Sequence, residues 1–295
     1  MLGVSVIIPM FNREKYISSA IDSVLSQDFE GLVEVIVVDD GSTDRSVEIA
    51  RSYGEKIILV EKPESCKIQG PSGARNRGLA IATHEYVSFL DSDDYYLPGF
   101  LEKMIAELQA NQEVGFVFCR LKRVDSDGVF SDWTRTRMSR LDVEYPFLFR
   151  SYGINTDTIV LRKKVLGEVG VFREDLTNGE DGDLWMRISE RYPGKFVDYE
   201  GAVYRHGYGS QLTKKDTVYI NECAKKVFLS ALNRNFFKEN RDYLRLLLIY
   251  RILLGIDRLE KGKKFFIYEA VDYFKLIVWY PLAFLKMIRM YMVRS

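Results

Sequence analysis

The N-terminal part of the chain alternates between apolar runs of strand length and segments with helical spacing. Residues 4–9 and 32–38 are apolar, largely β-branched runs, and residues 56–60 have the pattern of a third strand. Between the first two, residues 14–27 place apolar side chains at helical spacing, with Asn12 placed to cap this helix. A second helix, capped by Ser42 or Thr43, is expected to run to about residue 53. This alternation predicts a parallel, doubly wound sheet, whose ligands bind beyond the carboxyl ends of the strands.

An acidic cluster follows a fourth apolar run, residues 86–90. Asp91, Asp93 and Asp94 lie within four positions of one another. Side chains two apart on an extended chain point the same way, so Asp91 and Asp93 can face one ligand. Carboxylates this close repel one another unless a positive charge lies among them, and Mg²⁺ prefers carboxylate, water and phosphate oxygens. The cluster predicts a metal–diphosphate site; the alternative is an acidic turn that caps the helix expected from Pro98.

Two further segments favour the site over the plain turn. Asp39 and Asp40 follow the second apolar run, at the carboxyl end of another parallel strand. Residues 70–78 bring Arg75 and Arg77 to a glycine-containing helix N-terminus, where backbone N–H groups and the helix dipole favour phosphate. This loop matches neither a Walker A loop nor a G-x-G-x-x-G fingerprint, and solvated arginines are the alternative. Two acidic strand ends in one crevice favour a binding site.

The second half of the chain contributes two further candidate site residues, Asp181 and His206. Asp181 stands at the start of a helix whose apolar face includes Leu184 and Ile188. It is expected to cap this helix, and a capping carboxylate can also serve in catalysis. His206 follows the last expected strand, residues 195–203. An isolated histidine is more often structural than a metal ligand.

The C-terminal part has a different character. Helical patterns with few breakers cover residues 214–236, 239–258 and 263–293. Residues 261–295 contain seven basic and two acidic side chains, a net charge of +5, among aromatic residues. A proline and two charges interrupt the last apolar stretch, which makes it a poor membrane-spanning helix. Contact with an anionic membrane surface is expected, and the alternative is packing on the catalytic domain or on a second subunit.

Composition excludes some function classes. The 295 residues carry 42 basic and 42 acidic side chains, which argues against a nucleic-acid-binding surface over the whole protein. The three cysteines lie far apart without metal-ligand spacing, as is typical of reduced thiols in a cytoplasmic protein. The N-terminus lacks the basic and apolar pattern of a leader, so no secretion signal is expected.

Together these motifs resemble glycosyltransferase family 2, inverting enzymes with the A-type nucleotide-diphospho-sugar transferase (GT-A) fold. The resemblance covers about residues 4–210 and includes an acidic segment at Glu180-Asp181. The other four motifs, in the family's order, are VSVIIPMFN at 4–12, VDDGSTD at 38–44, GARNRG at 73–78 and LDSDD at 90–94. It implies an α/β fold with a mostly parallel central sheet flanked by helices, as a catalytic domain over 1–212 with a C-terminal α-helical extension over 213–295.

The resemblance also implies roles for single residues. Asp91-Ser92-Asp93 would be the D-x-D motif, in which Asp91 reaches the ribose and Asp93 ligates Mn²⁺ or Mg²⁺ at the diphosphate. Asp181 would be the general base, and His206 a metal or phosphate ligand. Asp39 and Asp40 would contact the nucleobase, Arg75 the nucleobase and the diphosphate, and Glu180 would lie near the acceptor. The positions implied in nucleotide or substrate binding are Pro9, Phe11, Asn12, Asp39, Asp40, Arg75, Asp91, Ser92 and Glu180.

The implied activity is metal-dependent transfer of a hexose or N-acetylhexosamine from a nucleotide diphosphate donor, with a UDP-sugar expected. The metal would stabilise charge on the leaving diphosphate, and one carboxylate would take the proton of the attacking hydroxyl. The expected acceptor is a lipid-linked saccharide in bacterial surface polysaccharide biosynthesis, at the cytoplasmic face of the inner membrane. The C-terminal helices are alternatively a homodimer surface.

Three other activities compete with this one. The first is sugar transfer to a polyprenyl phosphate, which calls for firmer membrane anchoring than the tail offers. A sugar-phosphate nucleotidyltransferase would need a glycine-rich signature with a catalytic basic residue near the N-terminus, and residues 4–12 lack it. A non-catalytic carbohydrate or nucleotide-sugar binding module is disfavoured, because clustered carboxylates cost stability without a ligand.

Overall fold

The computed structural model describes residues 2–66, 68, 70–132, 142–143, 154–176 and 178–206, with 223, 226–227, 230–231 and 234 beyond them. The chain divides into two compact units, Met1–Cys223 and Ala224–Ser295. The predicted domain boundary at 212/213 and the C-terminal helices fall largely outside the described residues, so membrane contact and dimerisation through them stay predictions. None of the helices in the described part combines the length and apolar character needed to cross a bilayer.

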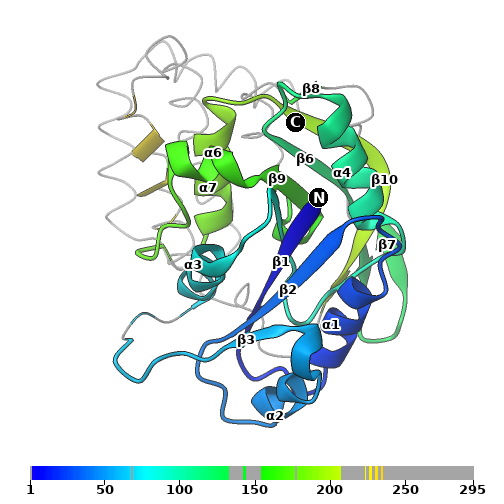
Figure 1. The fold of residues 1–295 in the computed structure, drawn as a ribbon, viewed down its shortest axis with the longest axis vertical. Helices are drawn as coiled ribbons and strands as arrows, with labels where there is room; N and C mark the ends of the chain where they lie inside the picture. The colour runs from blue at the N-terminus through cyan, green and yellow to red at the C-terminus, as the bar shows by residue number, and fades with distance from the viewer. Residues whose placement is uncertain are drawn as a thin grey trace, which may run out of the picture. The chain divides into compact units, whose positions relative to one another are not determined.

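A mixed β-sheet forms the centre of the first unit (Figure 1). Its strands lie in the order β3-β2-β1-β4-β9-β6-β10-β5, with β7 beside β6 and β8 beside β10. The strands are β1 (Gly3–Met10), β2 (Leu32–Asp39), β3 (Ile58–Val60), β4 (Tyr86–Phe89), β5 (Tyr95–Tyr96), β6 (Phe116–Val124), β7 (Phe130–Asp132), β8 (Asp142–Val143), β9 (Ile159–Arg162) and β10 (Gly194–Arg205).

The first four strands of this order are mutually parallel, as the sequence predicts. Strand β9 runs antiparallel to both β4 and β6, and β10 runs parallel to β6. Strand β9 therefore interrupts a series of parallel strands, and the short strands β5, β7 and β8 also pair antiparallel with their neighbours. The α/β fold class is confirmed.

Helices cover both faces of the sheet. They are α1 (Ile17–Leu25), α2 (Ser46–Arg51), α3 (Pro71–Ile81), α4 (Phe100–Ala110), α6 (Lys163–Val169) and α7 (Glu180–Ser189), with the 3₁₀ turns η1 (Gly54–Lys56) and η2 (Thr156–Thr158). One apolar core contains the buried faces of α1 and α4, and the other contains those of α3, α6 and α7. Figure 1 shows these two groups of helices on opposite sides of β1.

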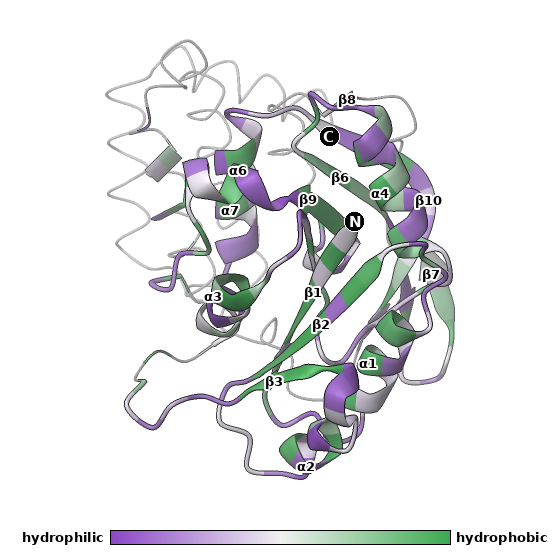
Figure 2. Cartoon of the chain, in the orientation of Figure 1, coloured by the Kyte–Doolittle hydropathy of each residue, from purple (hydrophilic) through white to green (hydrophobic). Residues whose placement is uncertain are grey.

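Side chains of β1 point alternately into these two cores. Val4, Val6 and Ile8 belong to the core with α1 and α4, whereas Ile7 belongs to the core with α3 and α7. Every residue of β1 is buried, and Figure 2 shows the central strands as largely hydrophobic. Burial of an aliphatic side chain of this size contributes about 1.5–3 kcal/mol, so packing on both faces fixes β1 at the middle of the sheet.

The predicted cap of α1 is wrong. This helix begins at Ile17 with Tyr16 as its N-cap, without a capping side chain. Asn12 lies in the left-handed region (φ 52°), and its Oδ1 accepts the N–H of Thr43 at 2.8 Å. The side chain expected to cap the helix therefore ties the loop after β1 to the loop after β2.

Two other helix starts also differ from expectation. Helix α2 begins at Ser46, with Arg45 as N-cap, and the Ser42 Oγ expected to cap it accepts the N–H of Asn12 instead. Helix α7 has Gly179 (φ 75°) as its N-cap, so Asp181 is the second residue of the helix and does not cap it.

Candidate active site

The candidate site lies at the edge of the sheet where the parallel strands end. The last residues of β1, β2, β4 and β10 are Met10, Asp39, Phe89 and Arg205. Because β9 runs antiparallel to β4, the turn η2 that precedes β9 reaches the same edge. Open α/β sheets bind their ligands at this kind of edge. Five segments from distant parts of the sequence therefore converge there.

Asp39 and Asp40 bind the loops around them. Asp39 accepts the N–H of Ser42 at 3.1 Å. Asp40 accepts the N–H of Gly70 at 2.6 Å and the guanidinium of Arg77 at 2.8 Å. Both carboxylates are buried. They fix the loops at the end of β2, and the contact with a nucleobase that the sequence predicts for them stays a prediction.

The loop after β1 exposes one aromatic ring beside these carboxylates. Pro9 is buried in β1, whereas Phe11 is 51% exposed. Asn12 receives the N–H of Thr43 and donates its own N–H to Ser42 Oγ at 2.9 Å. These hydrogen bonds fix the backbone next to Phe11, whose exposed ring offers a flat apolar surface for stacking.

Asp93 and Asp94 are held by basic residues. Arg13 Nε lies 3.4 Å from Asp93 Oδ2. Arg205 donates from its guanidinium to the Asp93 carbonyl at 2.7 Å and from its backbone N–H to Asp94 Oδ1 at 2.7 Å. Burial raises the pKa of Asp93, although Arg13 opposes this shift. Ser92, between Asp91 and Asp93, is buried. Arginines of the chain thus offset the repulsion among these carboxylates.

Arg75 joins the acidic turn to the start of α7. Its guanidinium lies 2.6 Å from Asp91 Oδ1 and 3.0 Å from Glu180 Oε1. It also lies 5.4 Å from the centre of the Phe172 ring, in a cation–π arrangement. The Arg75 side chain is only 4% exposed. The structure therefore brings two predicted site residues, Asp91 and Glu180, to a third, Arg75, whose positive charge both carboxylates share.

Asp157 is a site residue that the sequence did not reveal. It lies in η2, is fully buried, and its Oδ1 accepts the N–H of Asp91 at 2.7 Å. One carboxylate oxygen each from Asp91, Asp94 and Asp157 lies within 4.8 Å of the others. A lone aspartate before a short strand carries no recognisable signal, because only the antiparallel placement of β9 brings it to the acidic turn.

This group of aspartates suits a hard divalent cation. All the potential ligand atoms are carboxylate oxygens, which Mg²⁺ and similar ions prefer. Asp157 Oδ2 is buried and accepts no hydrogen bond from an N–H or hydroxyl group in the described residues. Burial and the nearby Asp91 charge raise the pKa of Asp157 to about 8, and burial also raises that of Asp94. Burial therefore disfavours the charged form of both carboxyl groups unless a cation lies among them.

Asp181 faces this group from α7. Its Oδ1 accepts the N–H of Gly182 at 2.7 Å, and its Oδ2 accepts the hydroxyl of Thr156 at 3.5 Å. Burial raises the pKa of both Asp181 and Glu180, and the positive charge of Arg75 opposes both shifts. A carboxylate whose pKa lies closer to neutrality is a stronger base than a free aspartate. The role of general base that the resemblance implies for Asp181 stays a prediction.

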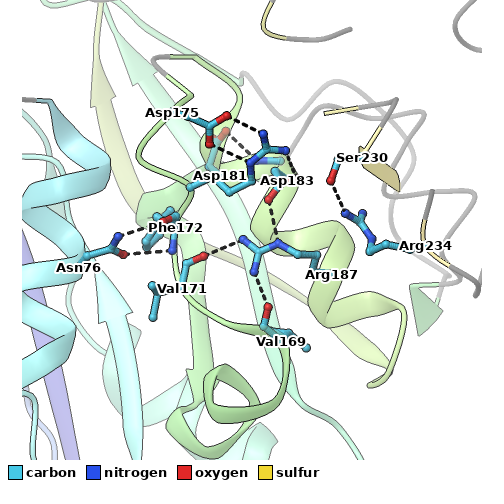
Figure 3. A network of polar contacts seen from close by, with 12 residues as sticks. Asn76, Val169, Val171, Phe172, Asp175, Asp181, Asp183, Arg187, Ser230 and Arg234 are labelled. Atoms are coloured by element: carbon cyan, nitrogen blue, oxygen red, sulfur yellow. Dashed lines mark hydrogen bonds and ion pairs between the residues drawn. The ribbon is translucent and has the colours of Figure 1, made fainter. Parts of the chain in front are cut away.

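A polar network fixes the first turns of α7 (Figure 3). Arg187 pairs with Asp183 at 2.8 Å and donates to the carbonyl oxygens of Val169 and Val171 at 2.6 and 2.7 Å. Asp183 is fully buried. Because the segment before α7 is bound to the helix itself, the start of α7 keeps its place against Arg75.

The same segment is also tied to α3. Asn76 donates to the Phe172 carbonyl at 2.9 Å and accepts the Phe172 N–H at 3.0 Å, as Figure 3 shows. Phe172 lies beneath Arg75, the neighbour of Asn76 in α3. This double hydrogen bond therefore holds the ring on which the Arg75 guanidinium rests.

His206 also reaches this edge of the sheet. Its backbone N–H donates to the Val124 carbonyl at 2.8 Å, and the centre of its ring lies 6.1 Å from that of the Tyr204 ring. The preceding residue, Arg205, contacts both Asp93 and Asp94. The role of His206 as a ligand stays a prediction.

Comparisons with known proteins agree with this geometry. The sequence model of glycosyl transferase family 2 matches residues 5–176. An uncharacterized glycosyltransferase of Rickettsia typhi is 33% identical over 216 residues, 71% of this chain and 65% of that protein. Glycosyltransferase GlyA of Streptococcus pneumoniae is 38% identical over 118 residues, 38% of this chain and 16% of GlyA. The chain spans less than two thirds of the length of these relatives.

Solved structures share the fold. S. aureus TarS 1–349 in complex with UDP-GlcNAc has a TM-score of 0.66 at 25% identity, over 84% of this chain and 70% of that chain. The mannosyltransferase PcManGT from Pyrobaculum calidifontis, in complex with GDP-Man and Mn²⁺, has a TM-score of 0.58 at 18% identity, over 97% and 83%. The expected nucleotide-diphospho-sugar transferase fold is thereby confirmed.

Proposed function

The chain belongs to glycosyl transferase family 2, and from this premise we propose that it transfers a sugar from a nucleoside diphosphate donor to an acceptor hydroxyl. One observation carries the proposal: the acidic turn and the Glu180-Asp181 pair meet across the buried Arg75. Such a transfer needs a donor site and a general base next to each other. The proposed donor is a UDP-hexose or UDP-N-acetylhexosamine, which the UDP-GlcNAc complex of TarS supports.

The proposed nucleotide site lies at the ends of β1 and β2. The half-exposed ring of Phe11 would stack on the base, with Pro9 and Asn12 shaping the loop beneath it. Asp39 and Asp40 would line the edge of this pocket. PcManGT is in complex with GDP-Man and TarS with UDP-GlcNAc, so the fold accommodates different nucleobases, and the UDP-GlcNAc complex of TarS is the support for UDP here.

The proposed diphosphate site lies at the acidic turn. Asp91 would reach the ribose, and Asp93, with His206, would hold Mn²⁺ or Mg²⁺ against the diphosphate. Such a cation stabilises negative charge on the departing diphosphate without a proton donor. Arg13 and Arg75 already contact Asp93 and Asp91, so two guanidinium groups lie where the phosphates would enter.

Asp181 is the proposed general base. It would take the proton of the acceptor hydroxyl as that oxygen attacks the anomeric carbon from the face opposite the diphosphate. This attack inverts the anomeric centre, so an α-linked donor yields a β-linked product. Glu180 would contact the acceptor from the same helix turn, while its pairing with Arg75 keeps the start of α7 in place.

The acceptor is proposed to be a lipid-linked saccharide at the cytoplasmic face of the inner membrane, in the synthesis of bacterial surface polysaccharide. The support is the net charge of +5 in residues 261–295 together with their aromatic content, which suits an anionic membrane surface. A liposome flotation assay tests this: the full chain should float with vesicles that contain anionic lipid and not with neutral ones.

The transfer itself is tested with Asp181→Asn. Release of UDP from UDP-GlcNAc in MnCl₂, with water or a saccharide as acceptor, should fall by about 10²-fold or more, the effect of a positioned base. The affinity for UDP, measured by calorimetry, should stay within about 3-fold of wild type, because Asp181 would contact the acceptor and not the nucleotide. The matched control is Asp175→Asn, the same change in a carboxylate whose side chain is 57% exposed. Turnover by Asp181→Asn close to that of this control would contradict the proposal.

A further inference from the structure

The turn η2 contacts both halves of the proposed active site. From one side, Thr156 donates its hydroxyl to Asp181 Oδ2 at 3.5 Å. From the other side, Asp157 Oδ1 accepts the N–H of Asp91 at 2.7 Å. These two contacts are made by adjacent residues. The distance between the proposed base and the proposed donor turn is therefore set by a single peptide unit.

This turn is fixed more firmly than an ordinary loop. Asn155 Oδ1 accepts the N–H of Asp157 at 2.7 Å, and the Asn155 carbonyl accepts the N–H of Thr158 at 3.0 Å. Thr156, Asp157 and Thr158 are all buried. Strand β9 follows at once and pairs with β4, the strand that leads into the acidic turn. Movement of η2 would therefore break the sheet beside it.

We propose that Thr156 and Asp157 are positioning residues that hold the base and the donor turn in register with each other. Thr156 orients the carboxylate of Asp181, and Asp157 holds the backbone of Asp91. The inference rests on the proposed function, since it concerns the same site. It adds two residues that neither the sequence motifs nor the family resemblance singles out, and it gives each a separate effect.

The two effects differ because the two partners act at different stages. Asp91 is placed at the donor, so loss of the Asp157 contact lets the donor turn shift and weakens donor binding. Asp181 acts only when the acceptor hydroxyl loses its proton, so loss of the Thr156 hydroxyl misorients the base during the chemical step. A turn with a purely structural role would instead reduce the active fraction, which lowers the apparent kcat and the stoichiometry of UDP binding of both variants together and leaves KM unchanged.

The first arm compares Thr156→Val, which removes the hydroxyl at nearly the same volume, with Thr156→Ser, which keeps it. Both are measured in the full chain with UDP-GlcNAc and MnCl₂. Thr156→Val should lower kcat for UDP release by about 10-fold, the scale of a hydrogen bond to a charged group, and leave the donor KM within about 2-fold. Thr156→Ser should restore kcat to within about 3-fold of wild type.

The second arm compares Asp157→Ala with Asp157→Asn, whose side-chain oxygen can still accept the N–H of Asp91. Asp157→Ala should weaken UDP binding by about 10-fold or more both in MnCl₂ and without metal, and Asp157→Asn should bind within about 3-fold of wild type. Because Asp157 also belongs to the group of aspartates that suits a cation, a loss seen only in MnCl₂ overturns its positioning role. Thermal unfolding followed by circular dichroism shows whether each variant is folded. If Asp157→Ala does not unfold cooperatively, Asp157→Ser replaces it, because serine is too short to reach the same N–H.

The outcomes separate this inference from the proposed function. A wild-type chain that neither binds UDP nor releases it from UDP-GlcNAc, with other nucleotide sugars equally inactive, overturns both. An active wild type in which the loss of kcat in Thr156→Val matches an equal loss in the stoichiometry of UDP binding, or in which Asp157→Ala leaves the UDP affinity unchanged, overturns only the inference. If Thr156→Ser loses as much kcat as Thr156→Val, or Asp157→Asn loses as much UDP affinity as Asp157→Ala, only the inference is overturned.

Discussion

Replacement of Arg75 by methionine should destabilise the folded chain strongly. The guanidinium forms two ion pairs, at 2.6 Å with Asp91 and 3.0 Å with Glu180, and the side chain is 4% exposed. Removing one partner of a buried pair costs about 3–5 kcal/mol, because the remaining charge is left without compensation. Since Asp91 is 35% exposed and partly hydrated, we expect the lower end, about 3 kcal/mol. In a unit of this size that lowers the melting temperature by roughly 10 °C.

The reason for this loss can be isolated by a second change. If an uncompensated Glu180 charge is responsible, Glu180→Gln in the Arg75→Met background should recover about 1–2 kcal/mol, although it deletes a further polar contact. Urea denaturation followed by circular dichroism measures both variants. The control is Arg51→Met, which breaks an exposed pair with Glu61 and should cost less than about 1 kcal/mol.

The pH dependence provides an independent check on the same prediction. Burial already raises the pKa of Glu180 in the folded chain, and loss of Arg75 should raise it further. A carboxyl group whose pKa is higher when folded than when unfolded favours folding at low pH, and this contribution disappears as pH rises through the folded-state pKa. Arg75→Met should therefore lose more stability at about pH 8 than at about pH 5. A loss no larger than that of Arg51→Met, or one that shrinks toward high pH, would refute the reasoning.

Three further outcomes follow from the site. Asp93→Ala should abolish the enhancement of UDP binding by MnCl₂ in calorimetry, and an unchanged response to Mn²⁺ would show that other residues hold the cation. Phe11→Ala should weaken UDP binding by about 10-fold through lost stacking, while the melting temperature stays constant because the ring is 51% exposed. Because burial raises the pKa of Asp181, UDP release should fall on acidification at a pH above the ordinary aspartate range; an acid limb that persists unshifted in Asp181→Asn would assign it to another group.

The parallel half of the sheet could be predicted because its signals are local. Each of β1, β2 and β4 is an apolar run that ends at a polar residue or two residues before one, and parallel strands bring these ends to one edge. The convergence of Asp39, Asp91 and Arg75 follows from this pattern and from the motifs. These residues are all held close to the strand ends that the sequence identifies.

Asp157 and the partners of the carboxylates could not be predicted, because they depend on contacts between distant segments. Asp157 reaches the acidic turn only because β9 pairs antiparallel with β4, and nothing in its own sequence indicates that direction. Arg13 and Arg205 look like ordinary surface arginines in the sequence, yet both bind the acidic turn. Asn12 has the composition of a helix cap, but a hydrogen bond across 31 residues to Thr43 takes its side chain instead.

The position of β10 determines when the site can form during folding. Arg205, its last residue, donates to Ser19 Oγ at 2.8 Å across 186 positions, and its N–H caps the buried Asp94. Contacts this distant in sequence carry a large loop-closure cost and form late. A nascent chain therefore completes β1, β2 and β4, with their acidic ends, long before the strand that stabilises the turn has left the ribosome. The proposed donor site is in this way expected only in chains that have been synthesised at least as far as β10.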